Sequence, residues 1–204
     1  MISSNFLADP RTVLVADASV VINLNATGCA REIIAALPNR WAVTTNALAE
    51  LVGGTRNGHD DARVLQALID DGLIELVRLG DTGSSVYETL VDGSALRTLD
   101  DGEAATIGHA HEIGGIALID ERKATNLCAE KFPELLVVST VQLLLHKAVV
   151  DALGQQGHVD AVIGALQKAR MRVPPGQISR VVAVIGEKSA SSCMSLPKAA
   201  RAAL

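Results

Sequence analysis

Short runs of apolar residues alternate along this chain with longer segments that have helical periodicity. Most of these runs are rich in β-branched residues, as in strands that are buried on both faces of a parallel sheet. We therefore expect strands at residues 12–16, 41–45, 74–79, 116–119 and 135–140. Strands that alternate with helices predict an α/β fold with three layers, in which a central parallel sheet of about five strands carries helices on both faces.

The segments between these runs have the apolar spacing of helices, and glycines interrupt them. The helix after the first strand should break at Gly28, and Asn46 should cap the helix that carries Glu50. A glycine-rich loop is expected at residues 53–58. Further helices are expected at 60–70 and 84–90, from 101, from 121 and at 141–153.

The alternation stops near residue 157, which predicts a change of architecture. Two helices are expected at 158–171 and 175–187, separated at Pro174 and Pro175. The last residues are rich in serine and alanine and are expected to be flexible. We therefore divide the chain into a domain at 1–155, a helical extension at 156–188 and a flexible tail at 189–204.

Composition narrows the classes of function. The net charge is -5 and the chain has one Trp, one Tyr and two Phe, so it has neither a global basic field nor a stacking surface for single-stranded nucleic acid. Any nucleic-acid role must rely on local basic residues, or on metal ions in an acidic pocket. Three distant cysteines favour neither a disulfide framework nor a zinc site. With no signal peptide and no apolar stretch long enough to span a membrane, we expect a cytoplasmic protein without a membrane partner.

Four carboxylates fall at strand ends or near helix starts, on the side where the strands exit: Asp17, Glu50, Glu103 and Asp120. Ligands of parallel α/β sheets bind at this edge. Clustered like charges raise one another's pKa, and a hard divalent cation such as Mg2+ is the usual compensation. An ion held in this way can activate water for phosphodiester hydrolysis. A lone acid in a first helical turn is more often a cap, so the inference depends on the whole set.

Neighbouring polar residues have roles that the sequence leaves open. Thr44 and Thr45 either hydrogen-bond Asp17 or cap the following helix. Arg122 and Lys123 either hold a phosphate or form a solvated pair at a helix start.

Four segments, in order along the chain, resemble the acidic motifs of the PIN-domain nucleases: Val13–Ile22, Val43–Leu51, Asp101–Ile107 and Leu118–Ala124. The third contains a Gly-Glu helix start that is typical of one PIN subgroup. The helical tail, with Arg172-Val173-Pro174-Pro175, resembles the C-terminal extension of the same subgroup. The motif likeness covers roughly residues 12 to 150, and the order of the motifs makes it more specific than any single one.

The resemblance implies a metal-dependent endoribonuclease that uses Mg2+ or Mn2+ and cleaves RNA. It assigns metal binding and catalysis to the four acids named above, with Ser19 as an auxiliary polar group. Asp101 competes with Glu103 for the third acidic position, and we favour Glu103. Glu121, beside Asp120, is a further auxiliary acid. Bacterial PIN proteins often act as toxins of toxin–antitoxin pairs, which implies an antitoxin protein and a second copy of the chain, in a homodimer, as partners.

Two other classes of protein fit parts of the pattern. Phosphatases and phosphotransferases of the α/β type also place an Asp after the first strand, but they need a second Asp two residues later, where this chain has Ser19. A non-catalytic PIN-like module that binds metal or protein is the other alternative. The presence of all four acids favours the nuclease over this module.

Overall fold

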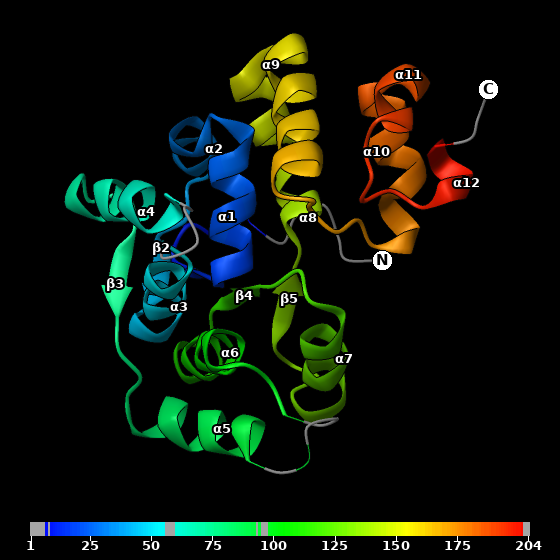
Figure 1. The fold of residues 1–204 in the computed structure, drawn as a ribbon. Helices are drawn as coiled ribbons and strands as arrows, with labels where there is room; N and C mark the ends of the chain where they lie inside the picture. Colours follow the sequence, from blue (N-terminus) through cyan, green and yellow to red (C-terminus); the bar gives the residue numbers. More distant parts are fainter. Residues whose placement is uncertain (1–6, 8, 56–59, 93, 95–97, 202–204) are drawn as a thin grey trace. The chain divides into compact units, whose positions relative to one another are not determined.

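Five parallel strands form one sheet at the centre of the fold (Figure 1). The computed structural model describes residues 7, 9–55, 60–92, 94 and 98–201. The strands are β1 (Leu14–Ala16), β2 (Trp41–Thr44), β3 (Glu75–Val77), β4 (Ile116–Leu118) and β5 (Leu136–Val138). Their order in the sheet is β3-β2-β1-β4-β5, and Val15 of β1 lies between Ala42 and Ala117. All five predicted strands and the α/β class are confirmed.

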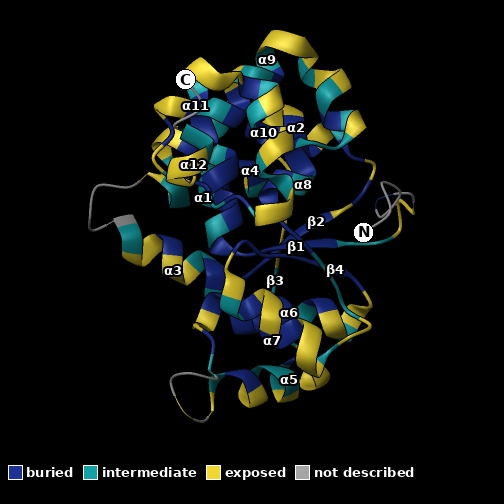
Figure 2. Cartoon of the chain, turned by 90° about the vertical axis from the view of Figure 1, so that its right-hand side faces the viewer, coloured by how far each residue is buried: buried dark blue, intermediate teal, exposed yellow. Residues whose placement is uncertain are grey.

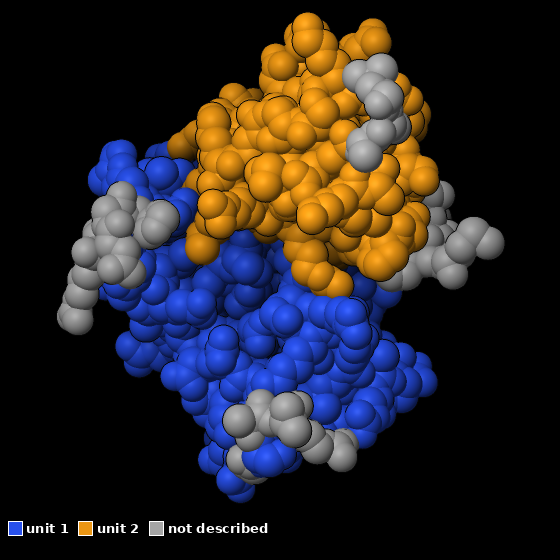
Figure 3. Space-filling model, turned by 45° about the vertical axis from the view of Figure 1, so that its right-hand side comes forward, with its two compact units in different colours: residues 1–21, 38–138 blue, residues 22–37, 139–204 orange. Residues whose placement is uncertain are grey.

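The described residues divide into two compact units (Figure 3). The first, within residues 1–21 and 38–138, contains the sheet and the helices α3 (Thr45–Thr55), α4 (Asp61–Asp70), α5 (Asp81–Val91), α6 (Asp101–Ile113) and α7 (Arg122–Lys131). The helix α1 (Ala18–Thr27) begins in this unit and continues in the second.

The second unit, within residues 22–37 and 139–204, is helical. Its elements are α2 (Ala30–Ala36), α8 (Thr140–Leu144), α9 (Lys147–Lys168), the 3-10 helix η1 (Pro175–Gln177), α10 (Ile178–Ile185), α11 (Glu187–Ser191) and α12 (Lys198–Arg201). Buried His158 of α9 makes a 2.8 Å hydrogen bond with the Leu144 carbonyl at the end of α8. No helix in the described part of the chain is both long and apolar enough to cross a membrane.

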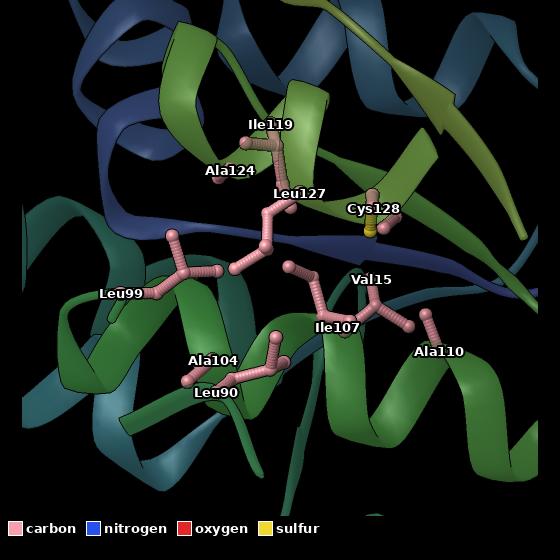
Figure 4. Close-up of a cluster of buried hydrophobic side chains, with 11 residues drawn as sticks. Val15, Leu90, Leu99, Ala104, Ile107, Ala110, Ile119, Ala124, Leu127 and Cys128 are labelled. Atoms are coloured by element: carbon pink, nitrogen blue, oxygen red, sulfur yellow. The ribbon is translucent and has the colours of Figure 1, made fainter. Parts of the chain in front are cut away.

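The core of the first unit lies between the sheet and helices α5 to α7. The central strands β1, β2 and β4 are buried throughout, whereas the edge strand β3 is largely exposed (Figure 2). Helix α6 contacts all three central strands. Figure 4 shows the result, a cluster in which Val15 and Ile119 from the sheet gather with Ile107 of α6 and Leu127 of α7. The alternation of side chains along each strand sends these residues to one face of the sheet.

Helices α5 and α6 pack with their backbones almost in contact. A Cβ placed on Gly108 of α6 would lie 2.5 Å from the Gly83 carbonyl oxygen of α5, closer than real Cβ contacts. Glu112, also on α6, accepts a 3.0 Å hydrogen bond from the backbone N–H of Gly80, at the start of α5. This bond, with those from Gly83 and Thr82, lowers the pKa of Glu112. Glu112 thus satisfies donors that a helix end leaves free.

That remote cap explains one difference from the sequence prediction. We expected the helix at 84–90, but α5 begins at Asp81 and ends at Val91. The first turn lacks a cap from its own chain segment, since the Gly80 N-cap position has no side chain. A local sequence pattern cannot predict this cap, because Glu112 lies 32 positions after Gly80.

Three other local predictions were wrong. Thr44, not Asn46, caps α3, because the Thr44 hydroxyl accepts a 3.2 Å hydrogen bond from the Ala47 N–H. Residues 53–55, expected in a loop, are the last residues of α3, and 56–59 lie outside the described residues. The expected helix at 141–153 is divided into α8 and the start of α9. The predicted break at Gly28 is confirmed, with a φ of 77° that favours glycine.

The C-terminal stretch contains more structure than we expected. Residues 189–204 were predicted to be flexible, yet they include the end of α11 and all of α12. Ala190, Cys193 and Leu196 are buried there, so apolar packing orders the stretch despite its serine-rich composition. The domain limits at 155 and 188 stay a prediction. Cys29, Cys128 and Cys193 are free thiols.

We expect Gly108→Ala to destabilise the protein by about 1–3 kcal/mol, because the added methyl must push the α5 backbone away. Gly53→Ala is the matched control, since a Cβ at this helical position meets no atom within 4 Å. It should be neutral or stabilise by about 0.5–1 kcal/mol. Urea unfolding of both variants measures the difference. Equal stabilities would show that α5 and α6 do not need this close approach.

Candidate metal centre at the carboxyl edge of the sheet

The strand order places two aspartates at the point where the sheet reverses its direction of winding. β2 and β3 lie on one side of β1, whereas β4 and β5 lie on the other. Asp17 follows β1 directly, and Asp120 follows β4 after one residue. The Asp17 N–H donates a 3.1 Å hydrogen bond to the Leu118 carbonyl, and both aspartates are buried. Such a switch point is where open α/β sheets bind ligands.

Asp17 has one carboxylate oxygen with partners and one without. Its Oδ2 accepts hydrogen bonds from the Ser19 hydroxyl at 2.7 Å and the Ser19 N–H at 3.2 Å. Its Oδ1 is buried and has no hydrogen-bond partner among the described residues. Burial raises the pKa of Asp17 despite the bonds from Ser19. A buried acceptor of this kind is costly unless something outside the chain pairs with it.

Glycine 102 allows a second carboxylate to approach Asp17. A Cβ on Gly102 would lie 2.5 Å from Oε2 of Glu50 and 3.2 Å from Oδ1 of Asp17. The unpartnered oxygen of Asp17 and a Glu50 oxygen therefore both lie against the first turn of α6. Burial raises the pKa of Glu50, as do the charges of Asp17, Asp100 and Asp101.

Glu103, in the first turn of α6, belongs to the same electrostatic group. Burial raises its pKa to about 7, and the charges of Asp17, Glu121 and Asp100 add to the effect. Its carboxyl is thus half-protonated near neutral pH in the absence of a cation.

Asp101 is occupied elsewhere. Its Oδ1 accepts a 2.7 Å hydrogen bond from the Tyr87 hydroxyl of α5. This bond raises the pKa of Tyr87. Asp101 is thus held by α5, whereas the charge of Asp17 acts on Glu103, and the choice of Glu103 as the third acid stays a prediction.

The structure adds two residues that the sequence prediction missed. By residue type Asp100 or Asp101 would cap α6, yet the Asp100 side chain makes no capping hydrogen bond, and its charge raises the pKa values of Asp17, Glu50 and Glu103. Asn46, which was expected to be a cap, lines a pocket of about 510 Å³ together with Ala49, Glu50, Asp100 and Asp101. Asp and Asn are common helix caps, so the sequence offered no reason to assign either residue to a site.

The remaining candidates lie around the start of α7 and α3. The Glu121 side chain caps α7 by accepting hydrogen bonds from the backbone N–H groups of Lys123 and Ala124. Arg122 is exposed and Lys123 is half-buried in the first turn of the same helix. Thr45 begins α3 and is half-buried, whereas its neighbour Thr44 serves as the cap.

The carboxylate oxygens of the site fit a hard divalent cation, although the side chains are not already placed to hold one. Within the described ranges, no group of three or more His, Cys, Asp or Glu side chains is already placed to hold a metal. The unpartnered Asp17 oxygen and the Glu50 oxygen beside Gly102 are nonetheless the hard ligands that Mg2+ and Mn2+ take. Asp17, Glu50, Glu103 and Asp120 are the residues that would hold such an ion.

These features define an α/β protein with an acidic site at the carboxyl edge of a parallel sheet. The chain belongs to the PIN-domain family, because the model of the DUF3368 family, a PIN domain, matches residues 13–187. The match extends over parts of both compact units. PIN domains are generally nucleases. Comparisons with curated proteins and with solved structures gave no match.

The titration of Glu103 should make the metal-free protein less stable as the pH rises. The folded pKa near 7 lies above the usual value of 4.5, so between these values the folded chain holds a proton that the unfolded chain has released. The free energy of unfolding should therefore fall from pH 4.5 to 7, by at most about 1.4 kcal/mol per pH unit, the slope that a difference of one bound proton gives.

Urea unfolding in EDTA at several pH values measures this slope. Glu103→Gln should flatten it, whereas Glu88→Gln, which changes an exposed glutamate of α5, should not. Equal slopes in the wild-type protein and Glu103→Gln would refute the raised pKa.

Proposed function

We propose that this protein is a metal-dependent endoribonuclease that hydrolyses RNA phosphodiester bonds. The observation that carries the proposal is the buried, unpartnered Oδ1 of Asp17 against Gly102, where an oxygen of Glu50 also lies. A chain gains nothing in stability from this arrangement by itself, since it buries one acceptor without a donor and sets like charges together. Membership of a family whose members are generally nucleases supports the same reading.

In this proposal Asp17 and Asp120 hold the first Mg2+ or Mn2+ ion, and Glu50 and Glu103 complete the cage or position the attacking water. A bound ion of this kind lowers the pKa of water and stabilises charge on the leaving oxygen. Without an ion, burial and the charges of neighbouring acids raise the pKa of Glu103 to about 7, and a cation beside it would favour the carboxylate that binds the ion or the water. Ser19 keeps Asp17 oriented through its hydrogen bonds to Oδ2, which leaves Oδ1 for the ion.

The substrate is assigned from charge and from the family. In this proposal Arg122 and Lys123, which begin α7 directly after Asp120 and Glu121, bind a phosphate of the RNA. The ion reverses the sign of the acidic site, so that a polyanion can approach a chain of net charge -5. The toxin role, an antitoxin partner and a homodimer rest on the family resemblance alone and remain parts of this proposal.

Mn2+ should raise the melting temperature of the wild-type protein and not that of Asp17→Asn. At about a hundred times its dissociation constant, a ligand stabilises by roughly 2.7 kcal/mol, which is a shift of several degrees for a chain of this length. Asp81→Asn is the matched control, because Asp81 begins α5 as Asp101 begins α6 but lies outside the site. Its shift should equal that of the wild-type protein.

RNA cleavage then separates a nuclease from a binding module. We expect Mn2+-dependent cleavage by the wild-type protein and by Asp81→Asn, and a loss of at least about a hundredfold in Asp17→Asn. A melting shift without cleavage would indicate a non-catalytic metal-binding protein. The absence of any shift at millimolar Mn2+ would mean that the acids do not form a metal site.

Without divalent ions, the effect of Asp17→Asn on stability should have the opposite sign. The amide removes a buried charge from a group of like charges, so the melting temperature should rise; about 1 kcal/mol corresponds to roughly 2–4 °C at this size. Differential scanning calorimetry in EDTA measures the change. A lower melting temperature would show that the carboxylate is stabilised by the folded chain itself.

A further inference from the structure

A pocket of about 510 Å³ lies beside the acids of the proposed ion site. Asn46, Ala49 and Glu50 of α3 line it together with Asp100, which precedes α6, and Asp101, which begins α6. Glu50 connects the pocket to the ion site, since its Oε2 lies with the buried Oδ1 of Asp17 against Gly102. The volume is in the range of sites that hold a small molecule or one unit of a polymer.

Two polar side chains in this pocket, those of Asp101 and Asn46, are not assigned to the ion. The Tyr87 hydroxyl donates to Oδ1 of Asp101 at 2.7 Å, which fixes the plane of the carboxylate and leaves its other oxygen as an acceptor. The Asn46 side chain is half-buried and makes no hydrogen bond to any residue that the structure describes. Asp101 and Asn46 therefore offer acceptors and an amide to a ligand that enters the pocket.

The charge of the pocket selects the chemistry of this ligand. Three carboxylates line it with one amide and one methyl group, so a bare phosphate is repelled and a neutral group with N–H donors is favoured. Among the parts of an RNA substrate, the bases fit this description. Carboxylates accept from the exocyclic amine of cytosine, and Asn pairs with the amine edge of adenine. Uracil has no exocyclic amine and presents carbonyl oxygens there, which face like-charged acceptors.

We propose that this pocket is a base-reading subsite, in which Asp101 and Asn46 select a base with an exocyclic amine over uracil and Tyr87 positions Asp101. The inference rests on the proposed function, because it takes RNA as the ligand and deepens the account of the same site. It assigns Asp101 to the substrate and not to the ion. Tyr87 acts only through Asp101 and is a positioning residue.

The single tyrosine of the chain gives a direct test that needs neither ion nor cleavage. Protein with 13C-labelled tyrosine rings has signals from Tyr87 alone. Adenosine and cytidine, which carry no phosphate, should shift these signals in a saturable way, and uridine should bind about tenfold more weakly. Asp101→Asn should abolish the preference, whereas Asp81→Asn should retain it. Equal affinities for the three nucleosides, or no shift with any of them, would overturn the proposal.

A second experiment compares the cleavage of RNAs that differ only in base composition. The ratio of kcat/KM for adenine-rich over uracil-rich RNA should fall about tenfold in Asn46→Ala and in Tyr87→Phe. Asn126→Ala, an exposed asparagine of α7, should leave the ratio unchanged. An unchanged ratio in both pocket variants would refute the subsite. If the wild-type protein cleaves no RNA but still prefers adenosine and cytidine, the pocket stands and the nuclease proposal fails.

Discussion

The burial of the Asp17 carboxylate is the constraint on which the site depends. Its strand lies between β2 and β4, so the side chain that follows it has little access to water. Ser19 satisfies one oxygen and leaves the other without a donor in the described structure. Burial also raises the pKa values of Glu50 and Glu103, and the charge of Asp17 adds to both shifts. The fold tolerates this cost because the apolar core beneath the sheet stabilises it elsewhere.

The first turn of α6 organises the acids around that carboxylate. Four consecutive residues have four different tasks there: Asp100 contributes charge, Asp101 binds Tyr87, Gly102 leaves room for two oxygens, and Glu103 holds a proton near neutral pH. The positive end of the helix dipole partly offsets the negative charge. This one turn of helix thus contributes residues both to the proposed ion site and to the neighbouring pocket.

The sequence predicted the architecture well, because the spacing of apolar residues follows from which side of a helix or strand is buried. All five strands, the break at Gly28 and the acids at the strand ends followed from local patterns. It failed where distant residues substitute for local ones. Glu112 caps α5 from another helix, and the packing of Ala190 and Leu196 orders a stretch with a flexible composition. In the site, Asp100 and Asn46 escaped notice because a capping role accounted for each of them.

The remote cap of α5 also bears on the order in which the chain can fold during its synthesis. Gly80 leaves the ribosome long before Glu112, and β1 is made about a hundred residues before its neighbour β4. Neither the start of α5 nor the centre of the sheet is complete until α6 and β4 have been translated. The nascent chain therefore carries Asp17 and Glu50 without the turn that brings them together until about half of its 204 residues have been made.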